Sequence, residues 1–240
     1  MIDRALVDIV GPAHVLTGDL ATGYEIDWSR RFGGPSQCVV RPGSTAQVSD
    51  VLTLLNREGI PVIPQGGNTG LVGGGVPAPS GVPPVILSLT RLDWIDPVDS
   101  LAGQVTVGAG ATLGAVQRHA CAAGWEYGVD LAARDTATIG GTIATNAGGI
   151  RVIAYGMTRA QLAGIEAVMP DGTVISHLSG LAKDNTGYDL AGLLCGSEGT
   201  LAVITAARLR LHRPAGATTV GLVGVADYDA ARAITSRAAS

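Results

Sequence analysis

Two glycine-rich stretches hold the residues of this chain that could do chemistry. The first, residues 64–75, has six glycines among its twelve residues. Glycine adopts positive φ at little cost and lets another backbone or a ligand approach closely. Successive backbone N–H groups in such a turn can converge on an anion. The stretch therefore predicts an anion-binding turn or a glycine-rich surface loop, and composition alone leaves both open.

The second stretch, residues 135–149, carries no charge after Asp135 and has many small hydroxyl or amide side chains. Packed against residues 64–75, it would line a narrow slot with backbone donors and short side chains. A flat ligand that carries a pyrophosphate suits such a slot. The structural alternative is a helix of small residues packed closely on a sheet. Taken together, the two stretches favour ligand binding.

Two shorter motifs resemble known fingerprints, but both have a better structural interpretation. The glycines of residues 108–114 lie between an expected strand and an expected helix, with Asp130 further along. A Rossmann fold usually opens with such a motif, whereas here about a hundred residues precede it, so a tight strand-to-helix turn is favoured. Ser197 is flanked by glycines at 196 and 199, but a nucleophile elbow needs glycine in place of Cys195. We therefore exclude a hydrolase.

Composition and charge limit the class of protein. A chain of 240 residues suits one large or two small domains. Its 35 glycines are about twice the usual share of roughly 7%, as expected where tight turns join apolar strands. The net charge of −4 and a single lysine, Lys183, exclude the electrostatic pattern of a nucleic-acid-binding protein. No apolar run reaches the roughly 18–20 residues of a membrane helix.

Cysteines, histidines and the N-terminus give weaker expectations. Cys38, Cys121 and Cys195 are too far apart for a CxxC metal clip, and we expect three buried thiols. The four histidines are equally dispersed, so no metal site is predicted. Residues 1–4 lack the features of a signal peptide, which predicts a cytoplasmic protein.

Strand and helix patterns indicate how the first stretch is positioned. Residues 38–40 read as a strand, Ser44 as a helix N-cap, and apolar residues recur at helical spacing up to Gly59. Residues 60–63 form the next expected strand, and residues 85–89 a third. This order predicts a small βαβ lobe over residues 36–95, after an N-terminal segment of residues 1–35.

A second lobe is expected over residues 100–214, with a mixed or antiparallel sheet and helices, so that the fold class is α+β. A strand at 104–107 leads into a helix that ends near residue 123. Further strands are expected at 162–169 and 173–177, joined by a Pro-Asp-Gly turn, and at 201–204 and 207–211. A strand at 218–225 and a helix at 227–239 follow. Residues 215–240 thus read as the start of a truncated C-terminal substrate domain.

The ordered set of motifs resembles the FAD-binding half of the vanillyl-alcohol oxidase / p-cresol methylhydroxylase superfamily. Within it, the chain is most similar to FAD-linked D-2-hydroxyacid dehydrogenases: glycolate oxidase subunits, D-lactate dehydrogenase and D-2-hydroxyglutarate dehydrogenase. The matching motifs are residues 64–71, 138–141, 144–149, 155–156, 183–190 and 196–201, collinear over roughly residues 30–214. Thr142, Ala154 and Ala202 depart from the pattern of close relatives.

The resemblance implies a noncovalent FAD site, because Asn68 replaces the histidine to which some relatives attach the flavin. It implies that the turn at 66–71 cradles the pyrophosphate. Thr138 and its neighbours would line the ribityl and isoalloxazine region, and Glu198 would approach the adenine side or the middle of the dinucleotide. The implied cofactor-binding residues are Pro64, Gln65, Gly66, Gly67, Asn68, Thr69, Gly70, Leu71, Thr138, Gly140, Gly141, Ala144, Asn146, Gly148, Gly149, Glu198, Gly199 and Ile204.

The implied function is the FAD-binding portion of an oxidoreductase that oxidises a small D-2-hydroxy acid by hydride transfer to flavin N5. The substrate-binding, metal-ligating and proton-accepting residues of the family lie in a C-terminal half that no residue here matches. The chain alone is therefore expected to be inactive, with its catalytic residues and electron acceptor unknown. The alternative is a non-catalytic FAD-binding electron-transfer subunit or remnant. Residues 183–190 and 196–201 argue against a cell-wall precursor reductase of the same superfamily.

Overall fold

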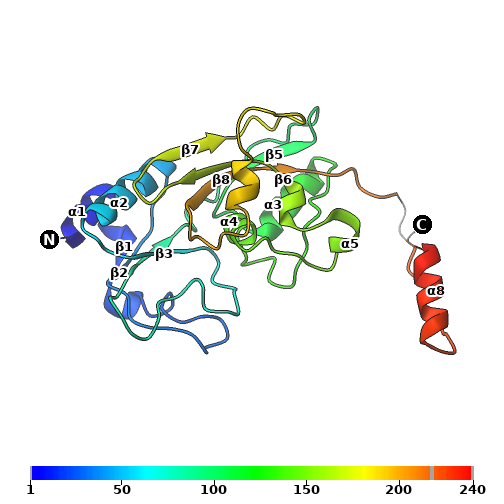
Figure 1. The fold of residues 1–240 in the computed structure, drawn as a ribbon, viewed down its shortest axis with the longest axis horizontal. Helices are drawn as coiled ribbons and strands as arrows, with labels where there is room; N and C mark the ends of the chain where they lie inside the picture. Colours follow the sequence, from blue (N-terminus) through cyan, green and yellow to red (C-terminus); the bar gives the residue numbers. More distant parts are fainter. Residues whose placement is uncertain (1, 217–218, 239–240) are drawn as a thin grey trace.

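The computed structural model describes residues 2–216 and 219–238. Two four-stranded sheets form two lobes, and helices pack on both (Figure 1). The first sheet mixes parallel and antiparallel pairs, and every pair in the second is antiparallel. The predicted α+β class with a smaller and a larger lobe is thus confirmed.

The first lobe has the strand order β1-β2-β4-β3. These strands are β1 (Val15–Leu16), β2 (Cys38–Val40), β3 (Val62–Gln65) and β4 (Val85–Ser88). The predicted strand–helix–strand order is present, but β2 and β3 do not pair with each other, because each pairs in parallel with β4. All four residues of β4 are buried, as expected for a central strand covered on both faces.

Helix α2 (Thr45–Arg57) begins where its sequence predicts. The hydroxyl of Ser44 accepts a hydrogen bond from the backbone N–H of Gln47, which caps the helix. Its apolar residues at helical spacing, Val48, Val51, Leu52 and Leu55, are buried against the sheet and against α1 (Ile2–Val10). Each such side chain contributes about 1.5–3 kcal/mol by leaving water. Two short 3₁₀ helices, Pro12–His14 and Gly18–Leu20, complete the N-terminal segment.

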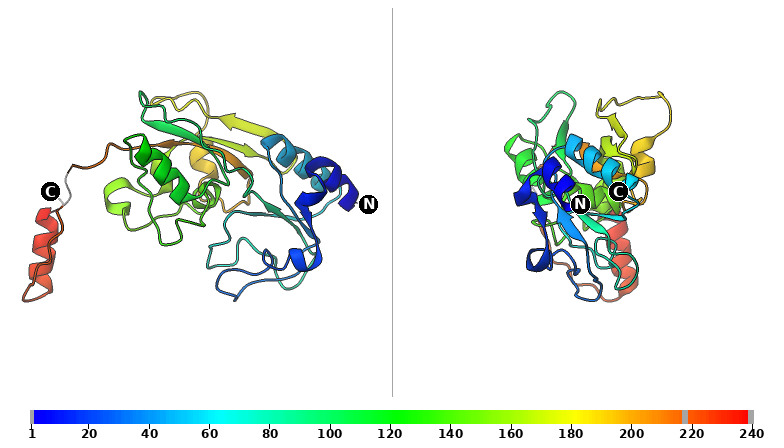
Figure 2. Two further views of the ribbon diagram at one scale, coloured as in Figure 1. Left: turned by 180° about the vertical axis from the view of Figure 1, so that it is seen from behind. Right: turned by 90° about the vertical axis from the view of Figure 1, so that its left-hand side faces the viewer.

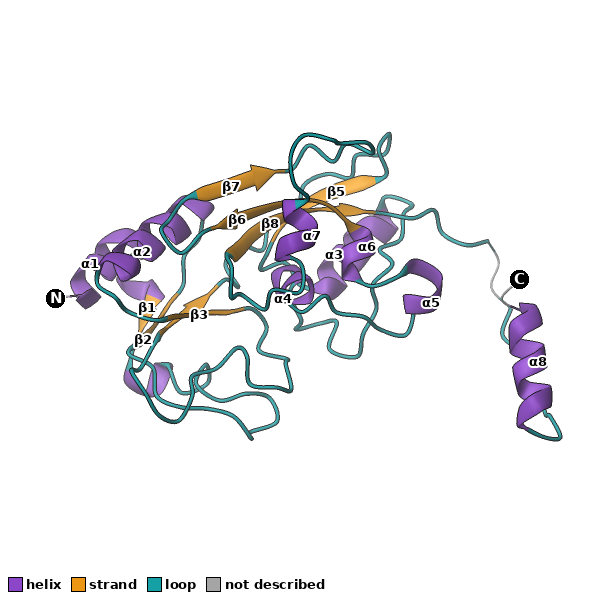
Figure 3. Cartoon of the chain, in the orientation of Figure 1, coloured by secondary structure: helices purple, strands orange, loops and turns teal. Residues whose placement is uncertain are grey.

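The second lobe has the strand order β5-β8-β6-β7. Its strands are β5 (Gln104–Gly108), β6 (Leu162–Val168), β7 (Val174–His177) and β8 (Val203–Arg210). Its helices are α3 (Leu113–Ala122), α4 (Ile139–Ala144), α5 (Val152–Tyr155), α6 (Thr158–Gln161) and α7 (Leu190–Leu194) (Figure 3). Side chains of α3, α4 and α7 share one buried core with β5, β6 and β8.

The two lobes are joined by a common core. Val168 and Val203, which come from the second sheet, are buried in the same apolar cluster as α2 and β4. On α2, the hydroxyl of Ser49 donates a hydrogen bond to the carbonyl oxygen of Gly172 in the turn between β6 and β7. The lobes therefore form one packed unit, with the glycine-rich stretches between them.

The structure corrects several expectations. The two strands expected at 201–204 and 207–211 are one continuous strand, β8, which pairs with β5 on one side and β6 on the other. Of the strand expected at 218–225, residue 218 lies outside the described part, and residues 219–225 form no strand. Cys38 and Cys195 are buried as expected, but Cys121 is exposed on α3.

The expected C-terminal helix is present as α8 (Tyr228–Ala238). It lies apart from both sheets in two opposite views (Figures 1 and 2), and none of its residues is buried. A surface helix normally buries an apolar stripe, so α8 gains little stability from the rest of the described chain.

Candidate cofactor site

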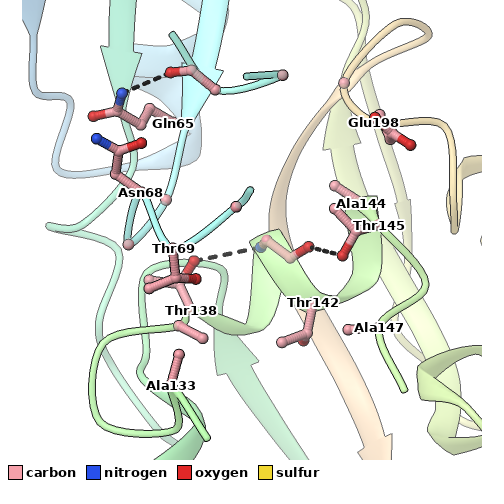
Figure 4. Close-up of a pocket in the computed structure, with 18 of the residues that line it drawn as sticks. Gln65, Asn68, Thr69, Ala133, Thr138, Thr142, Ala144, Thr145, Ala147 and Glu198 are labelled. Carbon is pink, nitrogen blue, oxygen red and sulfur yellow. Dashed lines mark hydrogen bonds between the residues drawn. The ribbon is translucent and has the colours of Figure 1, made fainter. Parts of the chain in front are cut away.

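A cavity of about 310 Å³ lies where the two glycine-rich stretches meet. Figure 4 shows Gln65, Asn68 and Thr69 on one side of it and Glu198 on another, with Thr142 and Thr145 from the α4 region below. The lining residues are Asp27, residues 64–70 and 72–75, Leu131, Ala133, Ala137, Thr138, Gly141, Thr142, Ala144, Thr145, Ala147, Glu198 and Gly199. Two segments almost seventy residues apart thus form one binding surface.

Two amide side chains fix the shape of the first stretch. Gln65 at the end of β3 donates from Nε2 to the carbonyl oxygens of Tyr24 (2.9 Å) and Gly75 (2.6 Å), which ties the two ends of the loop together. Asn68 has φ of 51° and donates from Nδ2 to the carbonyl oxygen of Ile26 at 2.8 Å. Asparagine tolerates this left-handed conformation better than most residues.

The two stretches touch so closely that side chains are excluded between them. A Cβ atom on Gly66 would lie 2.2 Å from Oγ1 of Thr138, and one on Gly67 would lie 1.8 Å from the carbonyl oxygen of Thr136. Only glycine permits this approach. The first stretch is therefore a packed turn rather than a loop held away from the protein.

Helix α4 satisfies both interpretations of the second stretch. Thr138 caps it by accepting a hydrogen bond from the N–H of Gly141 at 3.3 Å, and both residues line the cavity. On its other side, a Cβ on Gly140 would lie 2.8 Å from Cβ of Ala109 in the second lobe. The stretch is thus a small-residue helix packed tightly on the fold and also one wall of the cavity.

The turn at 196–199 closes the cavity from the α7 side. The N–H groups of Gly196 and Glu198 donate to the carbonyl oxygens of Ile143 (2.9 Å) and Ala144 (2.8 Å) at the end of α4. Glu198 has φ of 52°, a left-handed conformation that costs a non-glycine residue roughly 1–2 kcal/mol. Such strain is concentrated at functional sites.

Unpaired backbone donors distinguish the first turn. Among the described residues, the N–H groups of Gly67, Asn68, Thr69 and Gly70 donate to no acceptor. Gly67, Asn68 and Thr69 are half-buried and Gly70 is exposed. Because N–H groups shielded from water are nearly always paired, successive free donors in a cavity wall indicate an anionic ligand. No lysine or arginine lines the cavity, so backbone N–H groups and threonine hydroxyls are the donors that it offers to a pyrophosphate.

The predicted cofactor residues fall into three groups. Twelve line the cavity: Pro64, Gln65, Gly66, Gly67, Asn68, Thr69, Gly70, Thr138, Gly141, Ala144, Glu198 and Gly199. Gly140 and Ile204 line a smaller adjoining hollow of about 50 Å³. Leu71, Asn146, Gly148 and Gly149 line neither, and Gly149 instead packs so that a Cβ would lie 1.7 Å from the carbonyl oxygen of Asp130.

Asp27 is a lining residue that sequence reasoning missed. Its buried carboxylate accepts hydrogen bonds from the N–H groups of Arg31 (3.0 Å) and Phe32 (3.1 Å) and from the Ser29 hydroxyl (2.6 Å). Burial raises the pKa of Asp27, but these hydrogen bonds outweigh burial and leave that pKa below its ordinary value. The spacing Asp-x-Ser was the available signal, since such residues commonly fold back on their own turn.

The motif at 108–114 is structural, as expected. A Cβ on Gly108 would lie 2.1 Å from the carbonyl oxygen of Leu92, and one on Gly110 would lie 2.2 Å from that of Leu89. These glycines therefore serve backbone packing.

Within the described residues, no group of three or more metal-binding side chains is close enough to hold a metal ion. None of the helices described has the length and apolar character needed to cross a membrane.

The fold and the cavity define a dinucleotide-binding domain of two lobes. The chain belongs to the family described as "FAD binding domain", whose model matches residues 35–177. This match confirms FAD as the cofactor, and curated relatives confirm the similarity to D-2-hydroxyacid dehydrogenases.

Two curated relatives show the extent of the match. The chain is 38% identical over 218 residues to D-2-hydroxyglutarate dehydrogenase, mitochondrial, of Danio rerio, covering 90% of this chain and 40% of that protein. It is 41% identical over 206 residues to D-2-hydroxyglutarate dehydrogenase of Xanthomonas citri pv. viticola, covering 86% and 43%. The chain thus spans about two fifths of the length of the curated relatives it matches.

A solved structure shows the same fold. Alkyldihydroxyacetonephosphate synthase matches with a TM-score of 0.78 at 21% identity, over 88% of this chain and 40% of that chain. At this level of identity the match shows the architecture alone.

The prediction of a cytoplasmic protein is wrong. The relatives from Danio rerio and Bos taurus are named as mitochondrial proteins, although a bacterial relative also exists. The N-terminal argument misled because a pattern missing from residues 1–4 does not determine the compartment.

Proposed function

We propose that this chain is the FAD-binding portion of a dehydrogenase that oxidises a small D-2-hydroxy acid, and that it holds FAD without a covalent bond. One observation carries the proposal: two glycine-rich segments close on a single cavity, and one of them offers four successive unpaired N–H groups. The names of the relatives from Danio rerio and Xanthomonas citri support the class of substrate.

The turn at 67–70 would hold the pyrophosphate through its backbone. Hydrogen bonds to an ionised acceptor are about twice as strong as neutral ones. The close contact of Gly66 and Gly67 with residues 136–138 fixes the turn before the ligand arrives, which lowers the entropic cost of binding. Thr138, Gly141 and Ala144 would offer a wall without bulk to the flat parts of the cofactor, and Glu198 would face it from the other side.

Noncovalent attachment follows from the side chain at position 68. A covalent bond to a flavin requires a nucleophilic side chain, and Asn68 carries a neutral amide that is engaged with the carbonyl oxygen of Ile26. When bound, FAD supplies the hydride acceptor. The residues of this chain bind and orient it.

Absorbance of the purified chain tests the proposal. The expected result is a flavin spectrum, either as purified or after addition of FAD and gel filtration. Acid precipitation should leave the yellow colour in the supernatant, because no covalent bond retains it. Colour that stays in the pellet would contradict noncovalent attachment, and a colourless chain that takes up no FAD would contradict the binding site itself.

A further inference from the structure

A second cavity, of about 540 Å³, is lined in part by α7 and shares no lining residue with the cofactor cavity. Residues of the loop between β7 and α7 form much of its wall, together with residues of α6, α7, β6 and β8. That loop contains the motif at 183–190, to which the cofactor site assigns no role. Its volume is in the range of small-molecule sites.

Two arginines line this cavity without a carboxylate partner. The guanidinium of Arg159 donates to the carbonyl oxygens of Gly192 and Cys195, and that of Arg210 donates to the carbonyl oxygens of Leu162 and Ala160. Among the described residues neither forms an ion pair. A guanidinium has five N–H donors, so each keeps several for a ligand.

Both cations line the same cavity. Arg210 reaches the carbonyl oxygen of Ala160, the residue directly after Arg159. Like charges in one cavity repel, and an anion bound between them would relieve that repulsion.

The acidic groups at the cavity are already engaged. Oδ2 of Asp184 lies 2.6 Å from Nε2 of His177, and its Oδ1 accepts from the N–H of Thr186 at 2.9 Å. Oδ1 of Asp189 accepts from the N–H of Gly192 at 2.8 Å, which caps α7. In the described part of the chain, neither carboxylate forms an ion pair with Arg159 or Arg210.

Lys183, the only lysine in the chain, is adjacent in sequence to the lining residues Ala182 and Asp184 but does not line the cavity itself. We propose that this cavity binds a small molecule bearing a carboxylate or a phosphate, with Arg159 and Arg210 as its anchors. Planar guanidinium groups suit such oxyanions because they can donate two parallel hydrogen bonds. The proposal does not depend on the cofactor, because the two cavities are separate.

Titration followed by NMR tests the site. The signals of arginine Nε–Hε groups are recorded while succinate or inorganic phosphate is added at an ionic strength held constant with chloride. The titration is run with and without FAD, because phosphate could also enter the glycine-rich turn. We expect saturable shifts of the Arg159 and Arg210 signals with at least one anion in both conditions. The anion that binds more tightly distinguishes a carboxylate ligand from a phosphate ligand.

Variants assign the binding to the two arginines. Arg159→Gln and Arg210→Gln should each weaken binding roughly tenfold or more, and the Lys variants at the same positions should weaken it less, because they keep the charge but lose the planar fork. Arg57→Gln, on the exposed end of α2, is the matched control and should leave binding unchanged. The proposal would be overturned by the absence of saturable binding of either anion, by binding that both Gln variants leave intact, or by an Arg57→Gln variant that weakens binding as much as they do.

Discussion

At the scale of single residues, the site depends on glycines that have no Cβ atom. Because Gly66 and Gly67 lack a side chain, the hydroxyl of Thr138 and the carbonyl oxygen of Thr136 can approach the first turn directly. In exchange, the N–H groups of residues 67–70 remain unpaired. In the proposed binding mode, the affinity for the pyrophosphate would therefore depend on backbone position, which is sensitive to very small changes of shape.

Gly67→Ala tests this dependence. A Cβ at this position would lie 1.8 Å from the carbonyl oxygen of Thr136, so the turn must move away from residues 136–138. We expect FAD affinity to fall roughly tenfold or more, about 1.4 kcal/mol, as measured by quenching of flavin fluorescence. Gly23→Ala is the control, because a Cβ there meets no atom within 4 Å. Equal affinities of Gly67→Ala and the parent chain would disprove the importance of the close contact.

Asp27→Asn gives a test by pH. Burial raises the pKa of Asp27, but the hydrogen bonds from Ser29, Phe32 and Arg31 prevail and hold that pKa below its ordinary value of 3.8. A carboxylate with a lowered folded-state pKa stabilises the fold above its unfolded-state pKa, and this stabilisation disappears as the pH falls through the folded-state pKa. We expect the melting temperature of Asp27→Asn to lie below that of the parent chain at neutral pH, and the gap to shrink below about pH 4.

The matched control for Asp27→Asn is Asp50→Asn, which removes one charge from the exposed face of α2. If the difference in melting temperature between Asp27→Asn and the parent chain is the same at pH 7 and in strong acid, the role given to the Asp27 carboxylate is contradicted.

At the scale of elements, local signals identified most of the helices and strands but not their neighbours. The Ser44 cap and the apolar spacing of residues 48–55 fixed α2, because capping and helical periodicity act within a few residues. The insertion of β4 between β2 and β3 depends on pairing across the sheet, which no local pattern encodes. Residues 219–225 have a strand-like pattern but no partner strand in the described part of the chain.

The site shows the same division. The turn at 66–70 could be predicted because its glycines are adjacent in sequence. The left-handed conformation of Glu198 could not be predicted, because it results from contacts with residues far away in sequence. The entry of Asp27 into the cavity could not be predicted either, because it depends on a turn that the sequence pattern shows only weakly.

Ser44→Ala tests the contribution of the α2 cap. The hydroxyl of Ser44 accepts from the N–H of Gln47 at 3.2 Å, and its loss leaves that donor at the helix start unpaired. We expect a loss of about 1 kcal/mol in the free energy of unfolding, measured by urea denaturation. Ser44→Asp should restore most of it, since aspartate also caps helices well. A stability of Ser44→Ala equal to that of the parent would show that solvent replaces the cap without cost.

At the scale of the whole molecule, binding and turnover are expected to separate. The chain spans about two fifths of the curated relatives, and nothing in its described part offers a metal centre. We expect the purified chain with FAD to give no reduction of an artificial electron acceptor dye when D-lactate or D-2-hydroxyglutarate is added. Clear turnover that depends on the acid would show that the remaining length of the relatives is not needed for the reaction.

The shared core of the two lobes restricts how a cofactor could be exchanged. Val168 and Val203 anchor the second sheet among the side chains of the first, so swinging the lobes apart would expose both valines to water. FAD would instead bind and leave through local opening of residues 66–75, a loop closed by the hydrogen bond from the Gln65 amide to the carbonyl oxygen of Gly75. The rate of flavin exchange in this protein would then be set by one amide side chain rather than by a hinge between domains.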